Sequence, residues 1–126
     1  MKKMLTHIKF IGDLQIFVDP FLSLYFDYKK GLYALFVNLS DAAKNNQYLF
    51  FYANKEQILD YMHETIGLKD ISADKPLYIT EKRQNGTFKE INEIPETPQI
   101  FEFNRNIKFD PDYCLDYYEI IWSINN

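Results

Sequence analysis

The 126-residue chain contains only one cysteine and four glycines, and each scarcity excludes a class of protein. A single cysteine cannot form an internal disulfide, which rules out a small disulfide-stabilised scaffold. The isolated glycines form neither a dinucleotide-binding fingerprint nor a phosphate loop, and no serine lies in a G-x-S-x-G motif. No enzymatic activity is therefore predicted from local motifs.

The chain also lacks a long hydrophobic run. No segment approaches the roughly 18 uninterrupted apolar residues of a membrane-spanning helix. Met1, Lys2 and Lys3 are followed by interspersed polar residues such as Thr6 and Lys9, unlike the continuous apolar stretch of a signal peptide. We therefore predict a cytoplasmic protein that makes no contact with a membrane.

Aromatic residues, by contrast, are abundant and make up 17% of the chain, with 11 Phe and 10 Tyr. Each tyrosine hydroxyl needs water or a protein partner, so several tyrosines should be half exposed. The net charge of −4 is unevenly spread: residues 84–126 carry 8 acids and 3 bases, whereas residues 1–83 carry 10 acids and 11 bases. The basic groups are small, and binding to nucleic acid is not predicted.

Short apolar runs rich in β-branched and aromatic residues, separated by turn residues, predict strands. These runs occupy residues 14–18, 21–28, 32–38, 47–53, 77–82, 87–91 and 99–104. Gly31 and the Asn85-Gly86 pair predict tight hairpin turns. An irregular loop is expected at 92–98.

A change of periodicity after the fourth run predicts a helix. Asn54 and Gln57 have the spacing of a capping box, and the apolar positions that follow predict a helix over about 55–65. Residues 68–71 should form a short turn that packs on the core, and residues 42–44 one helical turn. Together these elements predict a single α+β domain over 1–126, with a curved, mainly antiparallel sheet of about six to seven strands, one packed helix and a C-terminal helix.

The C-terminal stretch FDPDYCLDYYEIIW (109–122) concentrates acids, tyrosines and the cysteine. Asp110 before Pro111 fits a helix N-cap followed by proline at the first helical position. Leu115, Tyr118 and Trp122 would share one face of that helix. A strand is the alternative for 111–123, because apolar residues also alternate from Cys114 to Ile124.

Three local patterns are candidates for chemistry. Asp110 and Asp112 have the D-x-D spacing of some divalent-cation sites, but helix capping explains both acids. Cys114 has no histidine in a recognisable local arrangement to activate it, so a buried structural thiol is predicted. His63-Glu64 begins the zinc-protease motif, yet Gly67 stands where the second histidine is required. No catalytic residue, metal site or cofactor is predicted.

The first two thirds of the chain resemble a small bacterial domain family without an assigned function. The resemblance spans about residues 12–80 and rests on Pro20-Phe21-Leu22 with Phe26, Gly31-Leu32-Tyr33, the segment from Glu56 to Tyr61, and Leu68-Lys69-Asp70. It implies a strand, a hairpin, and then a strand followed by a helix and a short turn. It implies no active-site residue and does not extend to the C-terminal third.

These observations favour a non-enzymatic bacterial protein that binds another protein with a basic surface, since acids interleaved with tyrosines supply both charge and aromatic contact area. By analogy, an immunity protein, antitoxin or inhibitor is the expected role. The alternatives are a ligand-binding or catalytic domain with a pocket between sheet and helix, and a homodimer. The predicted docking residues are Asp110, Asp112, Tyr113, Asp116, Tyr117, Tyr118 and Glu119.

Overall fold

The computed structural model describes residues 5–17, 20–39, 46–73, 75–89, 91–104, 106 and 108–126. Six strands follow one another in an antiparallel sheet whose spatial order is the order of the chain. The strands are β1 (Ile8–Ile16), β2 (Pro20–Asp27), β3 (Leu32–Asn38), β4 (Gln47–Ala53), β5 (Leu77–Glu81) and β6 (Asn92–Ile94). The predicted α+β class and antiparallel meander are confirmed.

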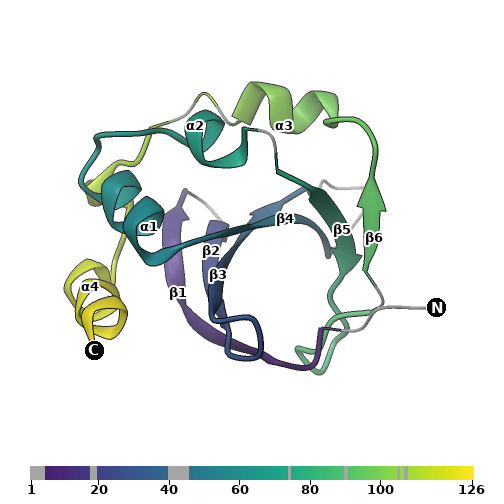
Figure 1. The fold of residues 1–126 in the computed structure, drawn as a ribbon, viewed down its shortest axis with the longest axis horizontal. Coiled ribbons are helices and arrows are strands. Elements are labelled where there is room, and N and C mark those ends of the chain that lie inside the picture. The colour runs from purple at the N-terminus through teal and green to yellow at the C-terminus, as the bar shows by residue number, and fades with distance from the viewer. Residues whose placement is uncertain are drawn as a thin grey trace.

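The sheet is strongly curved without closing, and Figure 1 looks along the inside of the curl. Part of the bend comes from β1, whose pairing with β2 shifts register between Phe10 and Gly12 and again on both sides of Gln15. Such bulges increase local twist and bend a strand. The sheet therefore has an outer face and an inner face, and the two faces carry different cores.

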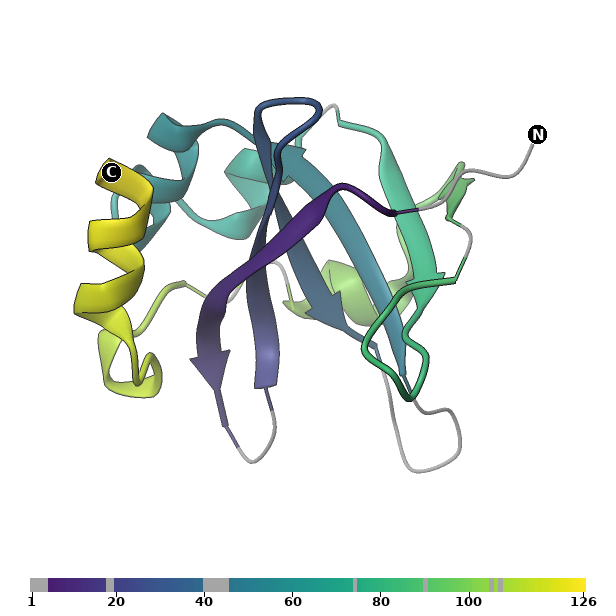
Figure 2. The same cartoon turned by 90° about the horizontal axis from the view of Figure 1, so that it is seen from below.

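The helices lie outside the curl, as Figures 1 and 2 show together. They are α1 (Lys55–Met62), α2 (Leu68–Ser72), α3 (Gln99–Asn104), the short 3-10 helix η1 (Pro111–Tyr113) and α4 (Tyr117–Asn125). The outer face of the sheet contributes Leu24, Leu35 and Phe51 to the main core, and α1 contributes Ile58 and Tyr61. Burying this aliphatic and aromatic surface is the main favourable term for folding.

A second, smaller core fills part of the inner face. Phe36, Phe50, Tyr25 and Phe88 are buried there together with Ala34. The rings of Phe36 and Phe50 stack at 4.6 Å between centroids, and the Phe36 and Phe88 centroids are 4.8 Å apart. Because neighbouring residues in a strand point to opposite faces, the near-continuous apolar pattern of β3 reflects burial on both sides.

Local signals account for the first helix and the first hairpin. The predicted capping box is present: the Gln57 backbone N–H donates to Asn54 Oδ1 at 2.8 Å, and the Asn54 N–H donates to Gln57 Oε1 at 3.0 Å. Gly31 has the positive φ of 69° that the β2–β3 turn requires. Asp27 supports this turn by accepting the backbone N–H groups of Lys29 and Lys30.

Several predicted boundaries are wrong in detail. The first strand begins at Ile8 rather than at residue 14, because the bulges break the alternation in its first half. The expected strand 87–91 is not continuous: Phe88 forms an isolated bridge with Lys82, Ile91 is also a bridge residue, and β6 follows within the expected 92–98 loop. The expected turn at 68–71 is the short helix α2, which buries its apolar residues as predicted. The expected helical turn at 42–44 lies outside the described residues.

The prediction of a strand at 99–104 is also wrong, because this segment forms α3. The backbone N–H groups of Phe101 and Glu102 both donate to the Pro98 carbonyl at 3.0 Å, which starts the helix. The two prolines at 95 and 98 turn the chain away from the sheet, so a strand here would have no neighbour to pair with. Phe101 is buried against Phe51, with 5.8 Å between ring centroids.

Candidate functional site

The C-terminal helix α4 is fixed to the domain by two buried isoleucines, Ile120 and Ile124. It packs against β1 and α1, and both isoleucines belong to the main core. The contact with β1 is so close that a Cβ atom at Gly12 would lie 2.6 Å from the Ile120 side chain. Glycine at this position therefore allows the helix to approach the strand, which fixes which face of α4 is turned outward.

The outward face of α4 and the turn before it carries three large apolar side chains. Leu115, Tyr118 and Trp122 are 78%, 85% and 67% exposed. Tyr118 and Trp122 are four residues apart and lie on one side of α4, whereas Leu115 lies in the turn just before the helix. Exposed apolar residues are ordinary when scattered, but a contiguous row rimmed by polar groups marks an interaction surface. We call these three residues the apolar row.

Exposed carboxylates flank the apolar row. Asp112, Asp116 and Glu119 are all exposed, and residues 109–126 contain no lysine or arginine. Asp116 occupies the N-cap position of α4, but its side chain makes no capping hydrogen bond. The three carboxylates therefore give this surface a negative potential that attracts positive groups.

The remaining predicted docking residues have structural partners. Asp110 accepts the Asp112 N–H at 3.0 Å and caps η1, whereas the C-terminal helix that it was predicted to cap begins only at Tyr117. Tyr113 is partly exposed beside Phe17, with 5.0 Å between ring centroids. Tyr117 is half buried on the main core and 6.0 Å from the Phe109 ring. Of the predicted set, Asp112, Asp116, Tyr118 and Glu119 lie on the exposed face.

Two residues of this face, Leu115 and Trp122, were not in the predicted docking set. The sequence pattern grouped them with Tyr118 on one helix face and gave no sign that this face is exposed. The sequence carries no clear signal of this exposure, because Asp116 and Glu119 lie as close along the chain to the buried Ile120 as to the exposed Tyr118.

Cys114 is buried, and its thiol lies 3.7 Å from the Asp13 carbonyl oxygen. Burial raises the pKa of this thiol to about 11, and the nearby Asp116 carboxylate also raises it. A raised pKa keeps the thiol protonated at neutral pH and removes the nucleophilic thiolate. Cys114 therefore occupies a structural position and is not part of an activated pair.

We expect a thiol reagent at pH 8 to label native Cys114 at least about a hundredfold more slowly than the unfolded chain, because a pKa near 11 instead of 9.0 lowers the thiolate fraction by that factor. The rate in the native state should rise as the pH approaches 11. The measurement is a time course with and without urea. Equal rates in both conditions would contradict the structural assignment.

The two other candidates for chemistry are His63 and the Asp110–Asp112 pair. His63 is exposed at the C-cap of α1, as expected for a residue at a helix C-terminus. Among the described residues, no group of three or more His, Cys, Asp or Glu side chains is arranged to hold a metal ion. The Asp110 carboxylate is used in capping.

Comparison with known proteins does not assign this chain to a family: no family model, curated protein or solved structure matches it. The resemblance over residues 12–80 stays a prediction. Within the described part of the chain, no helix is both long enough and apolar enough to cross a membrane. The function is therefore argued from the surfaces of the molecule.

Proposed function

We propose that the chain is a non-enzymatic protein that binds another protein through the outward face of α4. The observation that carries the proposal is the exposure of Tyr118 and Trp122 on α4, with Leu115 in the turn before it, while the opposite side of the helix is anchored in the core. Tryptophan and tyrosine are the side chains most often found at binding hot spots. A helix held by Ile120 and Ile124 presents them with little conformational cost on binding.

The charges around the apolar row define the chemistry of the partner. Asp112, Asp116 and Glu119 flank the row, and no base lies between residues 109 and 126. A complementary partner has an apolar groove with lysine or arginine at its rim, since opposite charges accelerate association and fix orientation. Enzymes that act on nucleic acids have such basic surfaces. More specifically, we propose that the protein is an immunity protein, antitoxin or inhibitor that binds such an enzyme.

Self-association through the same face is disfavoured by charge. Two copies that paired α4 against α4 would bring the carboxylates of both rows together, and like charges in an interface are destabilising. A different partner with a basic rim removes this repulsion. We therefore propose that α4 binds a different protein and not a second copy of this chain.

The partner is found by placing a photo-crosslinking phenylalanine analogue at Tyr118 in cells of the source organism. The same replacement at Tyr28 is the matched control, because Tyr28 is also exposed, at 60%, but lies in the β2–β3 turn. We expect a protein that crosslinks from position 118 and not from position 28. Binding is then measured between this protein and the purified chain.

Between the purified proteins, Trp122→Ala should weaken binding by about 2 kcal/mol or more, as expected for a central hot spot. Neutralising Asp116 and Glu119 to Asn and Gln should mainly slow association and reduce its dependence on salt. Calorimetry and surface plasmon resonance measure these quantities, with Tyr28→Ala as the control. Unchanged affinity of the Trp122→Ala variant, or a crosslink from Tyr118 to a second copy of the chain, would refute the proposal.

A further inference from the structure

A second surface lies on the inner side of the sheet, away from α4. It is a cavity of about 730 Å³ lined by β1, β2 and the loop that follows β5. The cavity lies on the inner face, because Tyr25 and Phe88 of the inner core line it, whereas the pocket considered as an alternative from the sequence was between sheet and helix. Its size falls within the range of small-molecule sites.

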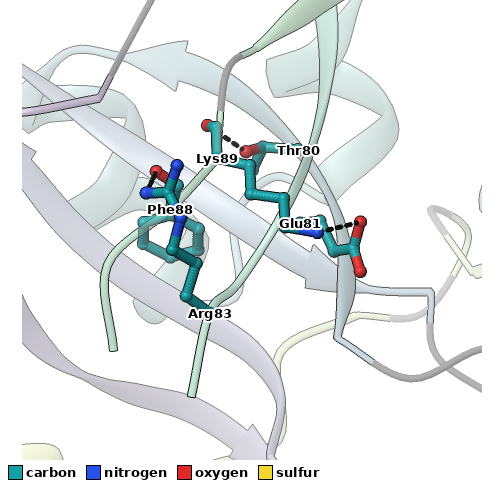
Figure 3. A network of polar contacts seen from close by, with 5 residues as sticks. All are labelled: Thr80, Glu81, Arg83, Phe88 and Lys89. Carbon is teal, nitrogen blue, oxygen red and sulfur yellow. Dashed lines mark hydrogen bonds and ion pairs between the residues drawn. The ribbon is translucent and has the colours of Figure 1, made fainter. Parts of the chain in front are cut away.

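One wall of the cavity is the loop that follows β5, and Figure 3 shows the polar contacts within this loop and between the loop and β5. The Thr80 hydroxyl donates to the Lys89 carbonyl at 2.9 Å, and Lys89 forms an ion pair with Glu81 at 3.3 Å. Arg83 Nη1 donates to the Phe88 carbonyl at 2.9 Å. These contacts position the loop so that the buried Phe88 ring packs against Tyr25 and Phe36.

Asp13 is the carboxylate that lines the cavity. Its Oδ1 accepts the Ser23 hydroxyl at 2.6 Å, and no lysine, arginine or histidine among the described residues pairs with it. A carboxylate has capacity for about four hydrogen bonds, so most of this capacity is open toward the cavity. Its charge extends across the cavity, because it contributes, after burial, to raising the pKa values of Tyr25 and Tyr48.

Aromatic rings line the same cavity as this carboxylate. Phe10, Tyr25, Tyr48 and Phe88 all line the same cavity. The Phe10 and Tyr25 rings meet edge to face at 5.3 Å, and Tyr25 lies 5.6 Å from Phe88. The electron-rich faces of aromatic rings attract organic cations, most strongly where water is excluded. A carboxylate among such rings is therefore suited to an ammonium group attached to an apolar body.

We propose that this cavity binds a small amphipathic amine, with its ammonium group at Asp13 and its apolar body on the surrounding rings. Two cations, Lys82 and Arg83, also line the cavity and would favour an anion instead. Arg83 is exposed and already bonded to the Phe88 carbonyl, so water and the loop reduce its pull on a ligand. Lys82 is half-buried like Asp13, but it also lines a neighbouring hollow formed with Asn46 and Glu81. Asp13 is less exposed than Arg83 and has one hydrogen-bond partner, so we take it as the main determinant.

The test uses three probes of matched size and different charge: phenethylamine, phenethyl alcohol and hydrocinnamate. Amide chemical shifts of the isotope-labelled protein are followed during titration with each probe. We expect phenethylamine to bind best and to shift the signals of residues that line the cavity. Asp13→Asn should weaken its binding about tenfold or more, because the ion pair in a partly water-excluded site is lost.

Asp60→Asn is the matched control, since Asp60 is exposed on α1 and loses the same charge. Phe10→Ala is a second test: Phe10 is 51% exposed, so this variant removes a wall ring without opening the core. It should also weaken phenethylamine binding. The proposal is overturned if hydrocinnamate binds best, if alcohol and amine bind equally, if Asp13→Asn behaves like Asp60→Asn, or if no probe binds at millimolar concentration.

Discussion

Replacing Phe36 by alanine should lower the free energy of unfolding by about 3–5 kcal/mol, the range for a fully buried phenylalanine. Phe36 has no exposed surface and is central to the inner core. Its ring lies 4.6 Å from Phe50, 4.7 Å from Tyr25 and 4.8 Å from Phe88. Truncation therefore leaves a cavity among rings held by β2, β4 and the loop after β5, so the site cannot readily collapse to fill it.

Urea unfolding followed by circular dichroism measures this loss. Since domains are stable by only about 5–15 kcal/mol, the variant will be close to unfolding at ambient temperature. Phe36→Leu should cost less than Phe36→Ala because it retains most of the buried volume. Phe10→Ala, a half-exposed phenylalanine on the same face, should cost about 1 kcal/mol or less. Equal losses for Phe36→Ala and Phe10→Ala would show that the inner face is not a packed core.

The sequence was informative wherever a feature depends on residues close together in the chain. The capping box of Asn54 and Gln57 needs only three residues of separation, and α1 begins where it predicts. Gly31 specified the β2–β3 turn because few other residues accept its positive φ. The buried apolar residues of α2 were likewise predicted from the spacing of Leu68 and Ile71.

Features that depend on distant residues were not predictable in the same way. The curvature of β1 comes from shifts in its pairing with β2, and composition gives no sign of them. Without that curvature the inner face would be flatter, so the cavity on this face could not be predicted from composition. The Asp13 and Ser23 pair joins two strands through a hairpin whose register is not visible in either strand alone.

The C-terminal helix illustrates a second limit. Its sequence is apolar on two sides: Ile120 and Ile124 form one, and Tyr118 and Trp122 form the other. Periodicity predicts a helix from such a segment but does not decide which side is buried. The close approach allowed by Gly12, more than a hundred residues earlier, decides it by admitting Ile120. The side left exposed is the one on which the proposed function depends.

Replacing Gln15 by alanine should lower the free energy of unfolding by about 2–4 kcal/mol, because a buried side chain and two hydrogen bonds are lost together. Gln15 is 1% exposed in β1. Its Nε2 donates to the Asp110 carbonyl at 2.8 Å, and its Oε1 accepts the Asp110 backbone N–H at 3.0 Å. One side-chain amide therefore pairs with both backbone groups of a residue 95 positions away and holds the start of η1 against the sheet.

Urea unfolding gives the global loss, and hydrogen exchange locates it. In Gln15→Ala the Asp110 amide should exchange faster than the amides of β3, because the segment leading to α4 loses its attachment while the central strands keep theirs. Gln84→Ala is the control: Gln84 is exposed in the loop after β5, so its loss should be within about 0.5 kcal/mol. If Gln15→Ala matches Gln84→Ala, the two bonds to Asp110 contribute nothing to stability, and α4 is held by Ile120 and Ile124 alone.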